Sequence, residues 1–215
     1  MRPLIIAGLA LVTTSCGLGK EPPAQDLPPW KFSKDASGVE VRILVKEPYT
    51  YLYALDGRLR EIRYDSDKNQ KPDVFAFFSG RDTPDRLEID DNRDGRIDRW
   101  EEYNPQGLLV KYATASRGSS PDRFVDVDPI TKTITQVETD ADHDGRRERR
   151  ETFSGGKLTQ SEVDTNADGR LDRLQTWQNG ILVAEEVDRD GDGKPDIRLH
   201  RSKTGSVTRV EHLQK

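Results

Sequence analysis

The chain repeats one acidic nine-residue pattern, D-x-[DN]-x-[DN]-G-x-x-[DE], along most of its length. Five copies begin at Asp65, Asp90, Asp140, Asp164 and Asp188, and the first has Gln70 in place of the glycine. The intervals between them are 25, 50, 24 and 24 residues. The long interval predicts a sixth copy near residue 114, where residues 114–122 retain only the last acid, Asp122. A fixed period of this length is typical of a repeat protein, in which each small unit buries its apolar side chains against its neighbours.

The composition limits how large a core these units can build. Hydrophobic residues make up 33% of the chain and charged residues 34%, and the mean hydropathy is −0.84. So few apolar side chains disfavour a thick sandwich or a deep enzyme barrel. The formal net charge of −5 gives no basic surface for nucleic acid. We therefore expect something other than a large core to stabilise the chain.

The segments between the acidic loops indicate β-hairpins. A glycine lies eight residues before three of the loops, at Gly57, Gly156 and Gly180, in turn sequences such as LDGRL and QNGIL. Glycine turns of this kind between alternating apolar residues are a strong hairpin signal. We predict an all-β fold, an elongated twisted antiparallel meander of about 24-residue hairpin repeats, with glycine turns on one edge and acidic loops on the other. A closed β-barrel or a propeller-like arrangement is the alternative.

The acidic loops carry oxygen ligands at alternate positions, which converge in a tight loop. Carboxylate, amide and carbonyl oxygens without His or Cys favour Ca²⁺, as in the first half of an EF-hand loop. The expected ligands are Asp65, Asp67, Asn69, Asp73, Asp90, Asn92, Asp94, Asp98, Asp140, Asp142, Asp144, Glu148, Asp164, Asn166, Asp168, Asp172, Asp188, Asp190, Asp192 and Asp196. Metal-free turns are the alternative, because Asp and Asn also form Asx turns.

Loop-by-loop differences predict unequal binding. The twelfth position, where an EF-hand has a bidentate Glu, is acidic only at Glu101 and Glu151. We therefore expect loops 90–98 and 140–148 to bind most strongly and loop 114–122 to bind nothing. Dissociation constants of about 10⁻⁴ to 10⁻³ M are typical of such extracellular sites. The basic residues at even loop positions and at position 7 are expected to point outward.

The N-terminus predicts an export signal and a lipid anchor. Residues 1–15 combine Arg2 with an apolar run and small residues, and the only cysteine, Cys16, follows. This segment resembles a bacterial lipoprotein signal, which implies lipidation of Cys16, for example with palmitate, and Gly17 in the next position favours the outer membrane. Such signals usually have Leu where this chain has Thr13, so cleavage by ordinary signal peptidase is the alternative. Proline-rich residues 16–38 are expected to form a tether, with Trp30 and Phe32 capping a repeat domain at residues 39–215.

Three further resemblances concern the repeat. The acidic loops resemble thrombospondin type 3 repeats and the first half of a dockerin loop, and the hairpins resemble MORN-type repeats. The whole chain is similar to bacterial repeat lipoproteins with a D-x-N-x-D-G-x-x-D unit. That resemblance implies a location in the cell envelope and carries over no activity.

The residues outside the acidic pattern add no catalytic constellation. The single cysteine is assigned to lipid, and no nucleophile, phosphate-loop or zinc motif occurs. We therefore expect a non-catalytic, calcium-stabilised scaffold or interaction module with a protein or polysaccharide partner in the envelope. A carbohydrate-binding or carbohydrate-active protein using Trp100, Tyr103 and Trp177 is the alternative, although these aromatic residues fit the core of the hairpins better. The recurrent Arg99, Arg123, Arg149 and Arg173 are expected to pair with acids of neighbouring loops.

Overall fold

The computed structural model describes residues 30–35 and 37–213 of the chain. The predicted signal, Cys16 and most of the predicted tether lie outside these residues. Within them, no helix is long and apolar enough to cross a membrane.

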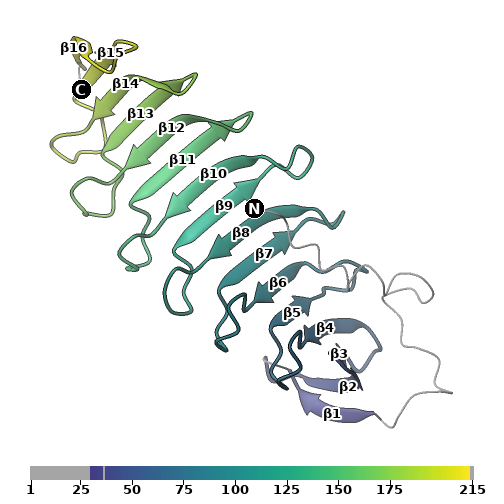
Figure 1. Cartoon of the computed structure of the whole chain (residues 1–215). Helices are drawn as coiled ribbons and strands as arrows, with labels where there is room; N and C mark the ends of the chain where they lie inside the picture. The colour runs from purple at the N-terminus through teal and green to yellow at the C-terminus, as the bar shows by residue number, and fades with distance from the viewer. Residues whose placement is uncertain (1–29, 36, 214–215) are drawn as a thin grey trace. The chain divides into compact units, whose positions relative to one another are not determined.

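The all-β prediction is confirmed. The described residues form 16 strands and no helix, and each strand has as its neighbours the strands before and after it in the chain. This order makes an open antiparallel meander and excludes the closed barrel that was the alternative (Figure 1). The chain divides into two compact units, residues 1–108 and 109–215, which are described separately.

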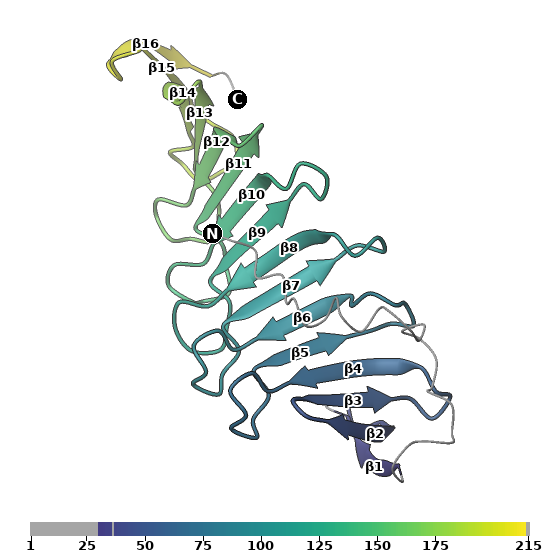
Figure 2. The same ribbon diagram turned by 45° about the vertical axis from the view of Figure 1, so that its right-hand side comes forward.

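The first unit contains seven strands. These are β1 (Lys31–Lys34), β2 (Glu40–Lys46), β3 (Tyr49–Tyr53), β4 (Leu59–Tyr64), β5 (Val74–Phe77), β6 (Arg86–Ile89) and β7 (Arg99–Tyr103). Their core is one apolar cluster that extends from β2 to β6 and includes Leu44, Leu59, Ile62, Val74 and Leu87. The strong twist of these strands is visible in Figure 2.

The sheet of the first unit begins with strand β1. Strand β1 lies inside the predicted tether and pairs with β2, with Lys31 opposite Ile43 and Lys34 opposite Glu40. Trp30 packs edge-on against Tyr53 with ring centroids 5.8 Å apart, as expected of a cap. Phe32, the other expected cap, is instead 68% exposed. Four residues of the predicted tether therefore belong to the sheet.

The second unit contains nine strands. These are β8 (Leu109–Thr114), β9 (Arg123–Val127), β10 (Ile134–Thr139), β11 (Arg149–Ser154), β12 (Lys157–Val163), β13 (Arg173–Gln178), β14 (Ile181–Val187), β15 (Ile197–Arg201) and β16 (Val207–His212). The acidic loops join β10 to β11, β12 to β13 and β14 to β15. At the opposite edge, glycine turns join β11 to β12, β13 to β14 and β15 to β16, whereas residues 128–133, which contain no glycine, join β9 to β10.

Cross-strand pairs explain the aromatic and leucine positions of the repeat. Phe153 lies opposite Leu158 and Trp177 opposite Leu182, and both pairs follow a register shift next to the glycine turn. In these two hairpins the aromatic residue after the acidic loop therefore lies opposite the apolar residue after the next turn, which supports the core interpretation of these two side chains.

The second unit has very little apolar core. Among residues 109–213, only Val125, Val137 and Ile197 are buried hydrophobic residues. All its strands belong to one sheet, and charged side chains form ion pairs across neighbouring strands. Arg150 lies between Glu138 and Glu162, with N–O distances of 2.8 and 3.3 Å. Arg150 on β11 thus bridges the two neighbouring strands, β10 and β12.

Candidate metal centre

The five acidic loops share one backbone conformation. In every loop the residues at positions 4 and 6 have positive φ, including the non-glycine residues Lys68, Gln70, Arg93, His143 and Ala167. Glycine adopts this conformation without strain, which explains its recurrence at position 6, whereas the side chains at position 4 adopt it at some cost. The five loops therefore have the same backbone fold at these positions.

The first acid of every loop accepts a hydrogen bond from the backbone N–H at position 6. The N–O distances are 2.7 Å in four loops and 3.1 Å in the fifth, for the pairs Asp65–Gln70, Asp90–Gly95, Asp164–Gly169, Asp188–Gly193 and Asp140–Gly145. The bond folds the loop around the carboxylate. In loop 164–172, burial raises the pKa of Asp164, but hydrogen bonds from Gly169, Ala167 and Asn166 outweigh it and keep the pKa below its usual value.

The other acidic positions extend the same pattern. In loop 140–148, Asp142 accepts from the N–H of Asp144 at 3.1 Å, and Asp144 accepts from the N–H of Arg146 at 2.7 Å. The last acid, Glu148, accepts from the N–H of Ala141 at the start of the loop. Each carboxylate is therefore fixed by a backbone donor, and its second oxygen is left to face its neighbours.

Three loops bring carboxylates together. Four acids converge in loop 140–148, where one oxygen each of Asp140, Asp142, Asp144 and Glu148 lie within 4.8 Å of one another. Groups of three form at Asp65, Asp67 and Asp73 and at Asp188, Asp190 and Asp196. Such a group fits a hard cation in its ligand chemistry, because like charges at this separation repel without one. Exposed acidic groups also occur without a metal, so the grouping alone leaves the cation a proposal.

Loops 90–98 and 164–172 differ from these three. Neither has three grouped carboxylates among the described residues, and both have an amide, Asn92 or Asn166, at the third position. In loop 90–98, Asn92 donates from both its backbone N–H and its Nδ2 to Asp98, at 3.1 Å each. Loops 90–98 and 140–148 were both predicted to bind Ca²⁺ most strongly. Only loop 140–148 has the grouped carboxylates that support this prediction.

The expected twelfth ligands lie on strands and have other partners. Glu101 belongs to β7, where it accepts a hydrogen bond from the Tyr103 hydroxyl and lies 3.4 Å from Arg99 Nε. Glu151 belongs to β11 and lies 3.2 Å from Arg149 Nε. Because both carboxylates pair along their own strands, the four-acid group in loop 140–148 forms without Glu151.

Asp140 is the most informative member of that group. Its side chain is 5% exposed, and its Oδ2 accepts the hydrogen bond from Gly145. Its Oδ1 is buried and has no hydrogen-bond partner. A buried carboxylate oxygen without a partner is strongly unfavourable, and a cation held between the four acids would satisfy it.

One basic residue contradicts the expectation that such residues point outward. Position 8 is apolar or proline in the other loops (Pro72, Ile97, Leu171 and Pro195) and is Arg147 in loop 140–148. Its Nη1 lies 3.6 Å from Asp140 Oδ2, and its guanidinium stacks 3.7 Å from the centroid of the Phe124 ring. Arg147 is held against the acids by this aromatic contact, and the substitution at position 8 is the sequence signal that would have revealed it.

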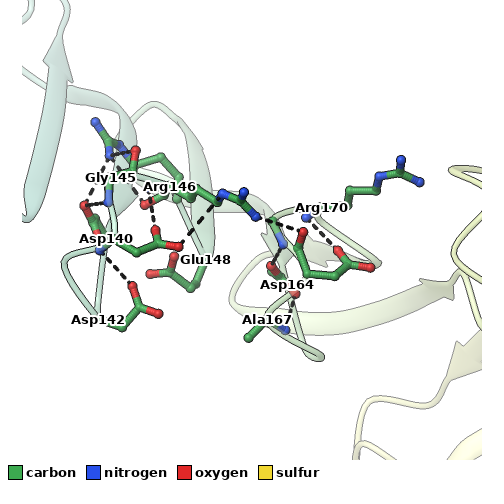
Figure 3. Close-up of polar contacts among 12 residues, drawn as sticks. Asp140, Asp142, Gly145, Arg146, Glu148, Asp164, Ala167 and Arg170 are labelled. Atoms are coloured by element: carbon green, nitrogen blue, oxygen red, sulfur yellow. Dashed lines mark hydrogen bonds and ion pairs between the residues drawn. The ribbon is translucent and has the colours of Figure 1, made fainter.

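Position 7 arginines link neighbouring loops of the second unit. Arg146 Nη1 donates to the backbone carbonyl of Asp168 at 3.1 Å, and Arg170 Nη1 donates to that of Gly191 at 2.9 Å. Figure 3 shows Arg146 extending from loop 140–148 to loop 164–172. The links run from one loop to the next along a single edge of the sheet.

Of the recurrent strand arginines expected to pair with acids of neighbouring loops, Arg99 pairs with a loop acid, whereas Arg149 and Arg173 pair with acids on strands. Arg149 pairs with Glu151 on its own strand, and Arg173 lies 3.7 Å from Glu185 on β14. Arg99 pairs with a loop acid, Asp91, at 3.2 Å, but this acid belongs to the loop directly before it. Side chains on the strands face the sheet rather than its edge, so they are directed away from the neighbouring loops.

Loop 114–122, which lacks most of the acids of the pattern, retains the structural role of its last acid, Asp122. Asp122 accepts from the Ser116 N–H at 2.8 Å, as the last acid does at the start of other loops. Its carboxylate lies 3.7 Å from His143 Nε2 of the neighbouring loop. Burial raises the pKa of Asp122. The hydrogen bonds from Ser116 and the charge of His143 have a larger, opposite effect, so the pKa lies below its usual value. The loop therefore keeps its closing hydrogen bond without a group of acids.

Comparisons with known proteins identify no family. No family model and no curated protein matches the chain. Among solved structures, TarM of S. aureus, solved in complex with Fondaparinux, alpha-GlcNAc-glycerol and UDP, has 9% identity and a TM-score of 0.39 over 46% of this chain. A Glycosylation Associate Protein complex from Streptococcus agalactiae has 13% identity and a TM-score of 0.31 over 59%. The chain spans about a fifth of the length of either, 19% and 22% respectively.

Proposed function

We propose that the chain is a non-catalytic repeat module whose acidic loops bind Ca²⁺ as structural staples. The observation that carries the proposal is the four-acid group of loop 140–148 with its buried, partnerless Asp140 Oδ1. A cation there satisfies that oxygen and removes the repulsion among the four carboxylates. The groups at Asp65, Asp67 and Asp73 and at Asp188, Asp190 and Asp196 act in the same way with three acids each.

Ion binding takes the place of the missing core. At about 1 mM free Ca²⁺ and a dissociation constant of about 10⁻⁴ M, each site adds about 1.4 kcal/mol to the free energy of unfolding. The second unit has two such groups and only three buried hydrophobic residues, so this contribution is large for it. The physical role proposed for calcium is therefore to hold the loop edge of a sheet that has no covering layer.

The biological role proposed is that of a scaffold or interaction module at the cell envelope. Cys16 is proposed as the site of lipidation, with the outer membrane as the location and a protein or polysaccharide as the partner. Incorporation of labelled palmitate, lost in Cys16→Ala, tests the anchor separately from calcium. An unlabelled wild-type protein would contradict the anchor.

A thermal melt tests the calcium proposal. We expect millimolar Ca²⁺ to raise the melting temperature, followed by circular dichroism, by about ten degrees over EGTA. The double variant Asp140→Asn/Asp142→Asn should lose a large part of that rise. The control Asp126→Asn, which lies on β9 beside Lys111, should retain it. Identical melts in calcium and EGTA would refute the proposal and leave the loops as metal-free turns.

A further inference from the structure

The last strand of the second unit has an open edge. Strand β16 pairs with β15 on one side, and among residues 30–213 no strand pairs with its other side. Five of its six residues are exposed, and Val207 and Val210 are 46% and 52% exposed. An exposed strand edge is a template for pairing with another strand.

The backbone of β16 shows which groups face outward. The N–H of Leu213 donates to the carbonyl of Asp196 at 2.8 Å, so the backbone groups of Leu213 point towards β15. Because the direction alternates along a strand, those of Glu211 and Arg209 also point towards β15. The N–H and C=O groups of Val210 and His212 therefore point to the open side, where a further strand would bind them.

We propose that this edge is a self-association surface, on which β16 pairs antiparallel with β16 of a second copy of the chain. A twofold axis at Val210 places that residue opposite its own counterpart as a hydrogen-bonded pair. The same register places Arg209 opposite Glu211 of the second copy, twice. These are non-hydrogen-bonded positions, where the side chains of an antiparallel pair lie closest together.

Charge selects this register over its neighbours. If one strand shifts by a single residue along the other, residues whose backbone N–H and C=O groups face outward lie opposite residues whose groups face β15. These registers form no backbone hydrogen bonds between the two copies. Moving the axis to Arg209 places two arginines opposite each other, and moving it to Glu211 places two glutamates opposite each other. The axis at Val210 is thus the register in the middle of the strand that satisfies both the hydrogen bonds and the charges.

Neighbouring basic residues keep the Glu211 carboxylate charged for this contact. His200 Nε2 lies 3.1 Å from Glu211 Oε2, and Arg209 Nη2 lies 3.8 Å from it. The hydrogen bond from His200, followed by the charge of Arg209, lowers the pKa of Glu211 below its usual value. The carboxylate is therefore charged at neutral pH. Arg209 is 67% exposed and is free to turn towards the second copy.

The association is expected to be reversible. Pairing through a single strand edge buries less than the roughly 1,200 Å² at the lower limit of standard interfaces. We therefore expect a dimer that dissociates at concentrations on the order of micromolar. The proposal is independent of the calcium proposal, because β16 contributes no loop acid.

Sedimentation equilibrium over a range of protein concentrations tests the proposal by charge reversal. Arg209→Glu alone and Glu211→Arg alone should each weaken the dimer about tenfold, because each places like charges opposite one another twice. The double variant Arg209→Glu/Glu211→Arg should restore it. Val210→Lys should abolish the dimer, whereas Val45→Lys, at a residue on β2 that is 48% exposed, should leave it unchanged.

The outcomes that overturn the proposal are equally specific. A wild-type monomer at every concentration overturns it, and so does a dimer that Val210→Lys leaves intact. If the double variant Arg209→Glu/Glu211→Arg dimerises as weakly as the single variants, the proposed register is wrong. Circular dichroism melts of each variant show that the sheet is folded, so loss of the dimer is not loss of the fold.

Discussion

The contact of Arg146 with the next loop can be tested by comparing two glycines, Gly169 and Gly193, of which only Gly169 lies beside an arginine of the preceding loop. Gly169 and Gly193 both lie at position 6 of a loop, both have φ of +86°, and both donate to the first acid at 2.7 Å. A Cβ on Gly193 would meet nothing within 4 Å, whereas one on Gly169 would lie 2.4 Å from Arg146 Nη1. We therefore predict that Gly169→Ala destabilises the protein more than Gly193→Ala does.

The difference follows from the cost of moving Arg146. Both substitutions place alanine in the left-handed region, at about 1–2 kcal/mol, and both reduce the entropy of the unfolded chain equally. Only Gly169→Ala also displaces the guanidinium from the Asp168 carbonyl, which it reaches at 3.1 Å. An exposed hydrogen bond of this kind contributes about 1 kcal/mol, and this is the extra loss expected.

Urea unfolding in EGTA, followed by circular dichroism, measures this difference without contributions from bound ions. A double-mutant cycle with Arg146→Ala isolates the contact, since without the guanidinium Gly169→Ala should destabilise no more than Gly193→Ala. Equal losses for the two glycine variants would refute the reasoning. An extra loss that persists in the Arg146→Ala background would also refute it.

Three further predictions concern charged groups of the second unit. Arg147→Leu, which copies Leu171 of the next loop, should raise the Ca²⁺ affinity of loop 140–148 about threefold to tenfold by calorimetry, because a cation 3.6 Å from Asp140 is removed; an unchanged affinity, as expected for the exposed control Arg117→Leu, would contradict this. The lowered pKa of Asp164 contributes stability that is present above its unfolded value of about 3.9 and is lost as the pH falls through the folded value. In EGTA, stability should therefore fall below about pH 4, and less steeply in Asp164→Asn; an identical slope would contradict the assignment. Glu185→Gln should lower the free energy of unfolding by about 2 kcal/mol in urea, since Glu185 is buried between Arg173 and Arg201, and a loss as small as that for an exposed acid would show that the arginines find other partners.

The regular parts of this fold were predictable from the sequence because each repeat carries its own local signals. Glycine turns and acidic loops fix where each strand ends, and the equal spacing fixes the meander. The glycine of the turn at Gly57, for example, donates to Ala54 with φ of +86°, as the hairpin pattern requires. Strand β1 was missed because its four residues, KFSK, lie outside the repeat and among prolines, so that no periodic signal marks them.

The acidic groups were predictable from the sequence only in part. Alternate acids converge in loops 65–73, 140–148 and 188–196, whereas loops 90–98 and 164–172 have the same spacing and form no group of three carboxylates among the described residues. The position of Glu151 was not predictable in this way, since its orientation depends on the strand that follows the loop. Arg147 and Arg146 depend on Phe124 and on the neighbouring loop, which are distant in the sequence.

The arginine links also bear on why the loops retain a common backbone after losing some acids. Arg146 and Arg170 bind backbone carbonyls, so they require the loop to have its shape and do not require its carboxylates. A loop such as 164–172, with an amide at position 3, can therefore continue the edge from 140–148 to 188–196 even where its own ion affinity is low. By the same reasoning, loop 114–122 has lost the acids at the centre and has kept Asp122, the one acid that closes the loop through Ser116. The contacts between neighbouring loops and the hydrogen bond that closes each loop therefore depend on the backbone shape and on the last acid, and not on the number of acids at the centre.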